Sequence, residues 1–280
     1  MVSCQITPER TVPAVKAAQT LQKIYGRARK VLRARNERSQ AARVARRDTG
    51  ALSYVVILTY GRTGSTVLQG ALNTVPGVSI RGENYGVVNY MAKLHAAAAR
   101  TRGEQSGGVT TDTISPWYGA HLVDPDRMLD TLRDGLVNDV LKPPAGSTIT
   151  GFKEIRHTTD YFSSFEELVD YVVFLDRLLP GVRFVVNTRS PEDTSKSGWW
   201  KDDPSAVELL SRTRDWMLRL PAAIEQRLGT RRVVTMVYET WNKNPQELAR
   251  MLGELDLPVD IEKLTEVSGR RLDHMQTKTA

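Results

Sequence analysis

The sequence predicts an α/β fold: a single domain with a central parallel sheet flanked by helices, preceded by a basic helical arm. From Tyr54 onward, apolar stretches of strand length alternate with segments of helical periodicity, and this alternation is typical of a parallel sheet covered on both faces. Residues 1–50 contain 12 Lys and Arg against 3 Asp and Glu, whereas the remaining residues contain 27 against 29. We therefore expect an arm over residues 1–50 and a domain over residues 51–280.

The composition sets further expectations. Of the 280 residues, 40% are hydrophobic, which suffices for a core, and no uncharged apolar run is long enough to span a membrane. The N-terminus lacks the apolar stretch and cleavage site of a secretory signal. Cys4 is the only cysteine, so neither a disulfide framework nor a Cys-based zinc site is expected. These features favour a cytoplasmic protein.

The arm has an apolar stripe at helical spacing, with arginines and lysines between its members, which indicates a basic amphipathic helix over about residues 14–47. The stripe consists of Leu21, Ile24, Tyr25, Ala28, Val31 and Leu32. It is expected to pack on the domain or on a second subunit. The alternatives are an anionic membrane surface, which would place the protein at the inner membrane, and nucleic acid. Few aromatic residues interleave with the arginines, which disfavours single-stranded nucleic acid.

The elements of the domain follow from apolar runs and turn residues. A buried run at Tyr54–Thr59 predicts the first strand, and apolar residues at helical spacing predict a helix from about Gly64 to Thr74, which Pro76-Gly77 ends. We expect further strands at 78–80, 148–156, 183–187 and 232–238, and helices at about 92–100, 128–140, 165–179, 205–227 and 245–255. Residues 103–119 are rich in Gly, Ser and Thr and are expected to be irregular.

The stretch between the first strand and the first helix suits an anion. A helix that begins directly after a strand points unpaired N–H groups and a partial positive charge at the turn. Gly61 and Gly64 allow the backbone to approach an anion, Ser65 and Thr66 add hydroxyl donors, and Arg62 adds a charge that can fork onto it. The alternative is an ordinary capped helix. A nucleotide-triphosphatase P-loop is disfavoured, because it needs a Lys directly after the second Gly.

The order strand, Gly61-Arg62-Thr63-Gly64-Ser65-Thr66, helix resembles the 5′-phosphosulfate loop of the sulfotransferases that use 3′-phosphoadenylyl sulfate (PAPS). Their pattern has Pro where this chain has Gly61, a change that should loosen the turn without removing a ligand. The resemblance implies that PAPS is the co-substrate and that the loop binds it through Arg62, Thr63, Gly64, Ser65 and Thr66. It implies no metal, and no His, Asp and Glu cluster here has metal-ligand spacing.

A second stretch, FVVNTRSPEDTSKSGWW, resembles the 3′-phosphate signature of the same family. Arg189 ends the strand, Asp193 follows four positions later, and Ser197 eight positions later. A helix that starts near Pro191 would place Ser197 about two turns in, within reach of the phosphate that Arg189 binds. The alternative for Arg189 alone is a surface ion pair.

A weaker resemblance follows at Tyr238-Glu239, whose Tyr lies near the adenine in that family. The resemblance covers about residues 54–255 in all.

The base for the acceptor proton is expected at Glu83. The family's phenol and steroid enzymes use a His in a Lys-Thr-His strand, but the comparable stretch here has Lys153 and then Ile155 at the His position, with His157 outside the pattern. Glycan sulfotransferases instead carry a Glu after the second strand, where this chain has Glu83, and we expect that strand to lie next to the loop strand. Arg62 and Lys153 are the expected catalytic cations. The alternatives are a capping or salt-bridged Glu83, and a Lys153 paired with Glu154 or Asp176.

A glutamate base points to a hydroxyl of a carbohydrate or glycolipid acceptor. Trp117, Tyr118, Trp199 and Trp200 could offer aromatic faces to a sugar, although packing in the core or a lid is the favoured interpretation for them. Two other functions stay open: a P-loop-type kinase or phosphotransferase, and a non-enzymatic module that binds anions or membranes. The sequence assigns neither the oligomeric state nor a role to Arg270 and Arg271.

Overall fold

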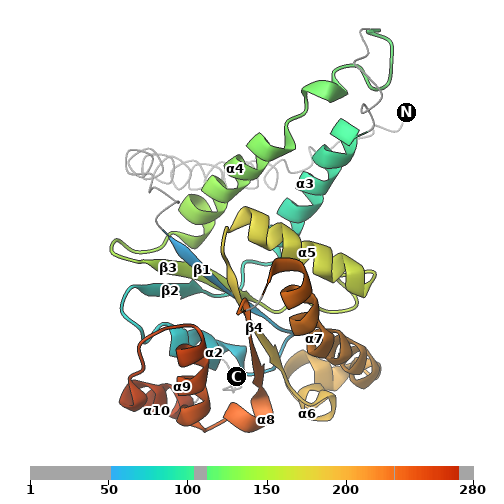
Figure 1. Cartoon of the computed structure of the whole chain (residues 1–280). Helices are drawn as coiled ribbons and strands as arrows, with labels where there is room; N and C mark the ends of the chain where they lie inside the picture. The colour runs from blue at the N-terminus through green and yellow to red at the C-terminus, as the bar shows by residue number, and fades with distance from the viewer. Residues whose placement is uncertain (1–51, 104–111, 230, 271–280) are drawn as a thin grey trace, which may run out of the picture. The chain divides into compact units, whose positions relative to one another are not determined.

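A computed structural model describes residues 52–103, 112–229 and 231–270. It confirms the predicted α/β fold, a five-stranded parallel sheet flanked by helices (Figure 1). The strands are β1 (Ser53–Leu58), β2 (Val78–Arg81), β3 (Ile149–Glu154), β4 (Arg183–Thr188) and β5 (Val233–Val237). The residues of the three inner strands, β1, β3 and β4, are almost entirely buried because helices cover both faces, as apolar strands of a parallel sheet require.

The strand order is β2-β3-β1-β4-β5, so β1 lies in the centre of the sheet. β1 pairs with β3 from Ser53↔Ile149 to Leu58↔Glu154, and on its other side with β4. The expectation that the strand before Glu83 lies next to the loop strand is wrong, because β3 is inserted between β2 and β1. The long connection over residues 82–148 allows β3 to enter the sheet there. In such sheets ligands bind at the carboxyl ends of the strands.

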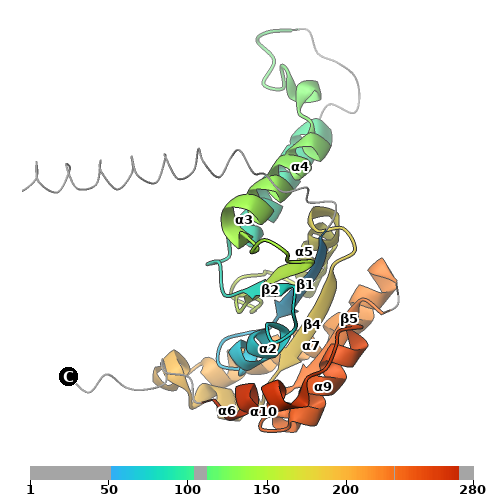
Figure 2. The ribbon, with the colours of Figure 1, turned by 90° about the vertical axis from the view of Figure 1, so that its left-hand side faces the viewer.

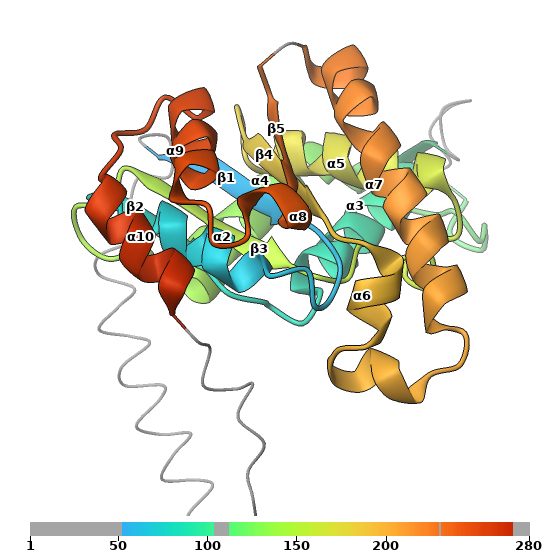
Figure 3. The ribbon, with the colours of Figure 1, turned by 90° about the horizontal axis from the view of Figure 1, so that it is seen from below.

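Two apolar layers hold the helices on the sheet. One layer packs α3 (Val87–Gly103), α4 (Pro125–Gly135), α5 (Phe165–Leu178) and α7 (Ala206–Leu228) against one face. The other packs α2 (Ser65–Leu72), α9 (Pro245–Glu254) and α10 (Ile261–Gly269) against the opposite face. Figure 3 shows α2, α9 and α10 on one side of the strands and α3, α5 and α7 on the other. α3 and α4 run side by side and extend beyond the sheet (Figure 2).

Several predicted elements differ in their limits. α3 begins at Val87, five residues before the expected start, where Gly86 takes a left-handed conformation. The expected helix at 128–140 starts at Pro125, which Asp124 caps, and continues as a π-helical segment over Leu136–Leu141. The short helices α6 (Pro191–Ser195) and α8 (Tyr238–Trp241) follow β4 and β5 directly. The sequence did not predict α10.

The predicted basic arm, including its helix at 14–47, lies outside the described residues. Within the described part of the chain, no helix is both long and apolar enough to cross a membrane.

Candidate active site

The loop between β1 and α2 turns sharply and relies on left-handed backbone at two positions. Arg62 has φ 71° and Gly64 has φ 77°. A Cβ on Gly64 would lie 2.7 Å from both the Trp241 and Tyr238 rings, so glycine is needed there for space as well as for conformation. No side chain caps α2, so the N–H groups of its first turn face the loop, as an anion site requires.

A buried hydrogen-bond network fixes the loop to the neighbouring strand. Thr63 and Thr59 share a hydroxyl hydrogen bond of 2.7 Å, and the Asn187 amide donates to the Thr63 carbonyl at 3.0 Å. The Trp241 indole N–H donates in turn to Asn187 Oδ1 at 2.9 Å. The predicted binding residues Thr63 and Ser65 are both buried, and the Thr63 hydroxyl also donates to the Tyr60 carbonyl. The Thr63 side chain therefore stabilises the conformation of the loop.

Arg189 lies at the end of β4, beside the loop. The Tyr60 hydroxyl holds this point by accepting from the Arg189 N–H at 2.9 Å and donating to the Arg189 carbonyl. Burial raises the pKa of Tyr60 to about 12, so the hydroxyl keeps its proton. The Arg189 guanidinium donates to the Arg62 carbonyl at 2.9 Å and lies 4.2 Å from the centre of the Tyr238 ring. Its buried Nε has no hydrogen-bond partner among the described residues.

Ser197 faces the same loop, but not from within a helix. α6 ends at Ser195, so the expected position two turns into a helix is wrong. Ser197 precedes a 3₁₀ turn over Gly198–Asp202, and its extended backbone brings its hydroxyl within 3.0 Å of Arg62 Nε, which donates to it. A Cβ on Gly198 would come within 2.8 Å of Arg62 Nε, so this glycine permits the approach.

Glu83 and Lys153 form an ion pair at the carboxyl end of the sheet, with Lys153 Nζ 2.5 Å from Glu83 Oε1. The Lys153 side chain is 6% exposed and that of Glu83 is 37% exposed. The alternative partners of Lys153 are occupied elsewhere, because Glu154 pairs with Arg156 and Asp176 pairs with Arg232. Glu83 is therefore salt-bridged, as the alternative interpretation expected. The ion pair joins two of the predicted catalytic residues.

Sequence analysis missed Glu154 and Arg156, which support Glu83. The buried Glu154 carboxylate accepts from the N–H groups of Gly86 and Ile155 and from Arg156 at 2.7–2.9 Å. Burial would raise the pKa of Glu154, but these donors outweigh it and hold the pKa below its usual range. Arg156 also lies 3.9 Å from Glu83 Oε2 and 4.3 Å from the centre of the Tyr85 ring. A charged pair at the end of the predicted strand 148–156 was the available signal.

His157 is fully buried, with Nδ1 3.1 Å from the Thr59 carbonyl oxygen and its ring against Phe162 and Tyr171. Burial holds its pKa below the usual value. It does not line the cleft, so it offers no base for an acceptor there.

A cleft of about 880 Å³ unites most of the predicted residues. Eight of them line it: Arg62, Gly64, Thr66, Glu83, Lys153, Arg189, Ser197 and Tyr238. Thr63 and Ser65 are buried behind the loop. Asn242, Lys243, Thr265 and Ser268 also line the cleft and were not predicted. The roles of all these residues remain predictions.

Other candidates divide between the cleft and the core. Trp199 is 53% exposed, lines the cleft and lies over Arg62, whereas Trp200 is buried and donates to the Gly61 carbonyl. Trp117 and Tyr118 are exposed away from the cleft lining. Arg270 borders the cleft and pairs with Glu266. Among described residues, no three His, Cys, Asp or Glu side chains gather as a metal site would need; that no metal takes part stays a prediction.

No protein-family model matches the chain, and no curated protein matches it significantly. Solved structures with a similar fold include the sulfotransferase domain of the Synechococcus olefin synthase, with 16% identity, a TM-score of 0.48, and coverage of 84% of each chain. A sulfotransferase from Alicyclobacillus acidocaldarius is 11% identical, with a TM-score of 0.45, and the match covers 80% of this chain and 88% of that one. One from Mycobacterium avium is 15% identical, with a TM-score of 0.40, over 78% and 67%. These proteins are of the class that the two motifs resemble, but at such identities and TM-scores the likeness decides nothing about activity.

Proposed function

We propose that the chain transfers a sulfuryl group from PAPS to a hydroxyl of a carbohydrate or glycolipid acceptor. The observation that supports this is the convergence on one cleft of residues from separate segments of the chain. Arg62 comes from the loop after β1, Glu83 from the loop after β2, Lys153 from β3, and Arg189 and Ser197 from the region after β4. If each of these residues had only a structural role, nothing would require all five to line the same cleft.

The cleft fits a nucleotide with two anionic ends. The turn before α2 offers helix N–H groups and the Arg62 guanidinium to a 5′-phosphosulfate. Arg189 and Ser197 would hold the 3′-phosphate, and the buried, unpartnered Nε of Arg189 is a donor that such an oxygen would satisfy. Tyr238 lies beside Arg189 and offers a ring face to the adenine.

The charges on the cleft wall suit transfer of an SO₃ group. By analogy with phosphoryl transfer, catalysis depends on positioning and on stabilising the charge that develops on the leaving oxygen. Arg62 and Lys153 both line the cleft and supply positive charge there. Glu83 would take the acceptor proton: Oε1 accepts from Lys153, and Oε2 lies 3.9 Å from Arg156, so the partly exposed carboxylate keeps acceptor capacity.

The acceptor class follows from the base. A partly exposed carboxylate in the cleft suits an aliphatic hydroxyl, which needs a base for its proton, and Trp199 provides an exposed ring face in the same cleft. The family resemblance associates a glutamate in this position with glycan acceptors. This is why we propose a carbohydrate or glycolipid rather than a phenol.

The test is a transfer assay with PAPS and a panel of monosaccharides, oligosaccharides and glycolipids, which follows the release of 3′-phosphoadenosine 5′-phosphate (PAP) and the sulfated product by mass spectrometry. The proposal expects a sulfated product with wild-type protein that requires PAPS. A parallel reaction with ATP and Mg²⁺ tests the kinase alternative. A phosphorylated product there, with none from PAPS, would contradict the proposed function.

A further inference from the structure

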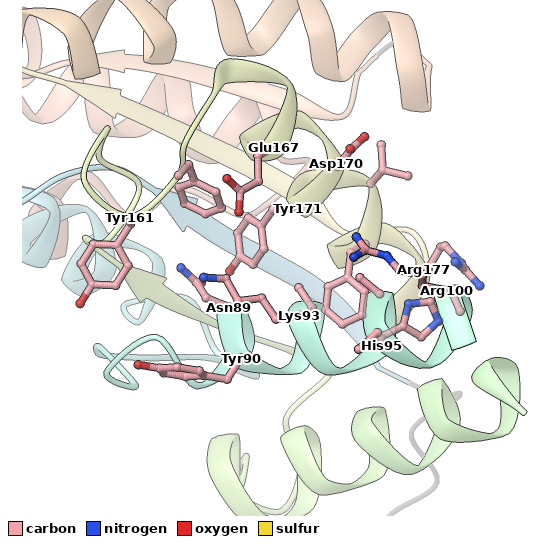
Figure 4. Close-up of a pocket in the computed structure, with 17 residues that line it drawn as sticks. Asn89, Tyr90, Lys93, His95, Arg100, Tyr161, Glu167, Asp170, Tyr171 and Arg177 are labelled. Carbon is pink, nitrogen blue, oxygen red and sulfur yellow. The ribbon is translucent and has the colours of Figure 1, made fainter. Parts of the chain in front are cut away.

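A groove of about 770 Å³ runs between α3 and α5, separate from the lining of the active-site cleft. Figure 4 shows Asn89 and Tyr90 from α3, and Tyr161 from the segment before α5, toward one end of it. Arg100 and Arg177 lie toward the other end. The eleven-residue step from Asn89 to Arg100 makes the groove about 16 Å long at 1.5 Å per helical residue.

Three buried polar atoms on the walls of the groove have no hydrogen-bond partner among the described residues. They are Asn89 Oδ1, His95 Nε2 and Tyr171 Oη, on side chains that are 7%, 5% and 3% exposed. Burial lowers the pKa of His95 and raises that of Tyr171, so both are uncharged near neutral pH. Buried polar groups ordinarily have hydrogen-bond partners. Three such groups without a partner in one groove indicate a ligand that supplies the hydrogen bonds.

The remaining wall is partly apolar, with Lys93 and Asp170 between its ends and further charged residues at them. Ala92, Ala96 and Ala99 follow one face of α3, where their small side chains leave room opposite Phe174. Glu167 lies toward the start of α5, and Arg177 lies toward its end, where it pairs with the exposed Asp126 at 3.1 Å. Arg100 lies near Arg177 and makes no ion pair with a described residue. Such a groove is complementary to an apolar chain with an anionic group at the arginine end.

The other end of the groove adjoins Glu83. Tyr161 Oη, on the groove wall, accepts from Arg156 Nε at 3.1 Å, and the same guanidinium lies 3.9 Å from Glu83. Arg156 and Tyr161 also lie close to Gly86. A Cβ placed on Gly86 would be 3.5 Å from Arg156 Cδ and 4.0 Å from Tyr161 Cε1. One layer of side chains thus separates the groove from the candidate base.

We propose that this groove binds an anionic amphiphile, at a site distinct from the active-site cleft. Its apolar chain lies along the alanines of α3, its anionic group meets Arg100, and its other end reaches Tyr161, one layer of side chains from Glu83. This proposal does not rest on the proposed sulfuryl transfer.

The experiment titrates 12-hydroxydodecanoate into the full chain by calorimetry, because its hydroxyl and carboxylate lie at opposite ends of an apolar chain. The variants are Ala96→Phe, which fills the groove, and Arg100→Gln, which removes the charge. Arg227→Gln is the control, since Arg227 is an exposed arginine of α7 paired with Glu166. PAP is titrated into each protein separately.

We expect binding to wild type and to the control, and at least tenfold weaker binding to Ala96→Phe and Arg100→Gln. The shorter 6-hydroxyhexanoate should bind at least tenfold more weakly than the longer chain, which keeps the test valid should Ala96→Phe unfold. Absent binding, or equal binding to wild type and both variants, would overturn the groove assignment while leaving PAP binding intact. Groove-dependent binding without PAP binding would support the groove assignment and would refute only the proposed sulfotransferase function.

Discussion

Lys153 Nζ lies 2.5 Å from Glu83 Oε1, and this ion pair joins β3 to the loop that follows β2. The lysine is almost buried, and the glutamate is more than one third exposed. The buried member therefore fixes the exposed carboxylate at the mouth of the cleft. Because β3 lies between β2 and the loop strand β1, the pair also brings the candidate base toward Arg62.

Glu83→Gln should abolish most of the transfer. The amide can still accept from Lys153 but cannot take the acceptor proton, so we expect the rate to fall by about 10²–10⁴-fold while PAP binds within about twofold of wild type. PAP release from PAPS and acceptor measures the rate. Glu262→Gln, at an exposed position of α10, is the control. A variant that keeps wild-type transfer would remove Glu83 from the mechanism.

Ser197→Ala should weaken PAP binding by about tenfold or more, since a hydrogen bond to a charged group such as the 3′-phosphate contributes about 1.5–3 kcal/mol. The substitution removes the hydroxyl that accepts from Arg62 Nε, and this same hydroxyl is the predicted donor to the phosphate. Calorimetric titration of PAP measures the change. Ser195→Ala is the matched control, because the Ser195 hydroxyl donates to the Glu192 carbonyl within α6 and does not line the cleft. Equal effects of the two substitutions would argue against a phosphate contact at Ser197.

The sequence was sufficient to predict the fold class and the strands that carry the cleft. The apolar runs and Gly/Pro breaks are local signals, and β1, β3, β4 and β5 lie where they placed them. The prediction that Ser197 lies within a helix was wrong because α6 ends at Ser195. The 3₁₀ turn that follows could not be predicted from residue propensities.

The pairing of Glu83 with Lys153 could not be predicted, since it depends on strand order. Periodicity indicates which segments are strands but not that β3 lies beside β2, and the alternative partners that the sequence suggested for Lys153 were Glu154 and Asp176. The role of Glu154 was missed for the same reason, because one of its donors, the Gly86 N–H, is 68 residues away in the chain. Contacts of such sequence separation arise only from the assembled sheet.

The two glycines of the loop should respond differently to alanine. Gly64→Ala forces a Cβ into left-handed backbone and against the buried Trp241, and we expect a loss of about 2–4 kcal/mol in the free energy of unfolding. At Gly61 a Cβ would meet the edge of the exposed Trp199 ring at 2.4 Å, which can move aside, so about 1 kcal/mol or less is expected. Urea unfolding measures both. A Gly61→Ala loss as large as that of Gly64→Ala would show that Trp199 is held rigidly.

The ion pair of Glu154 should make stability depend on acid pH. Its folded-state pKa lies below the ordinary value of about 4.3, so its contribution is present above that pH and is lost as the pH falls through the lowered folded-state pKa. Glu154→Gln should cost about 3 kcal/mol at pH 7, with a gap from wild type that narrows below about pH 4. Thermal unfolding followed by circular dichroism from pH 7 to pH 3 measures the gap. A gap that stays constant or widens in acid would contradict the assignment.

The most direct test of the central claim is calorimetric titration of PAP into wild type and Arg189→Ala, with ATP–Mg²⁺ as the competing nucleotide. Arg183→Ala is the control, because Arg183 begins β4 at the opposite end of the sheet and pairs with Asp256. We predict PAP binding that Arg189→Ala weakens at least tenfold, that Arg183→Ala leaves unchanged, and that ATP–Mg²⁺ does not match. Absent PAP binding, or a preference for ATP–Mg²⁺, would contradict the sulfotransferase account and favour a phosphotransferase.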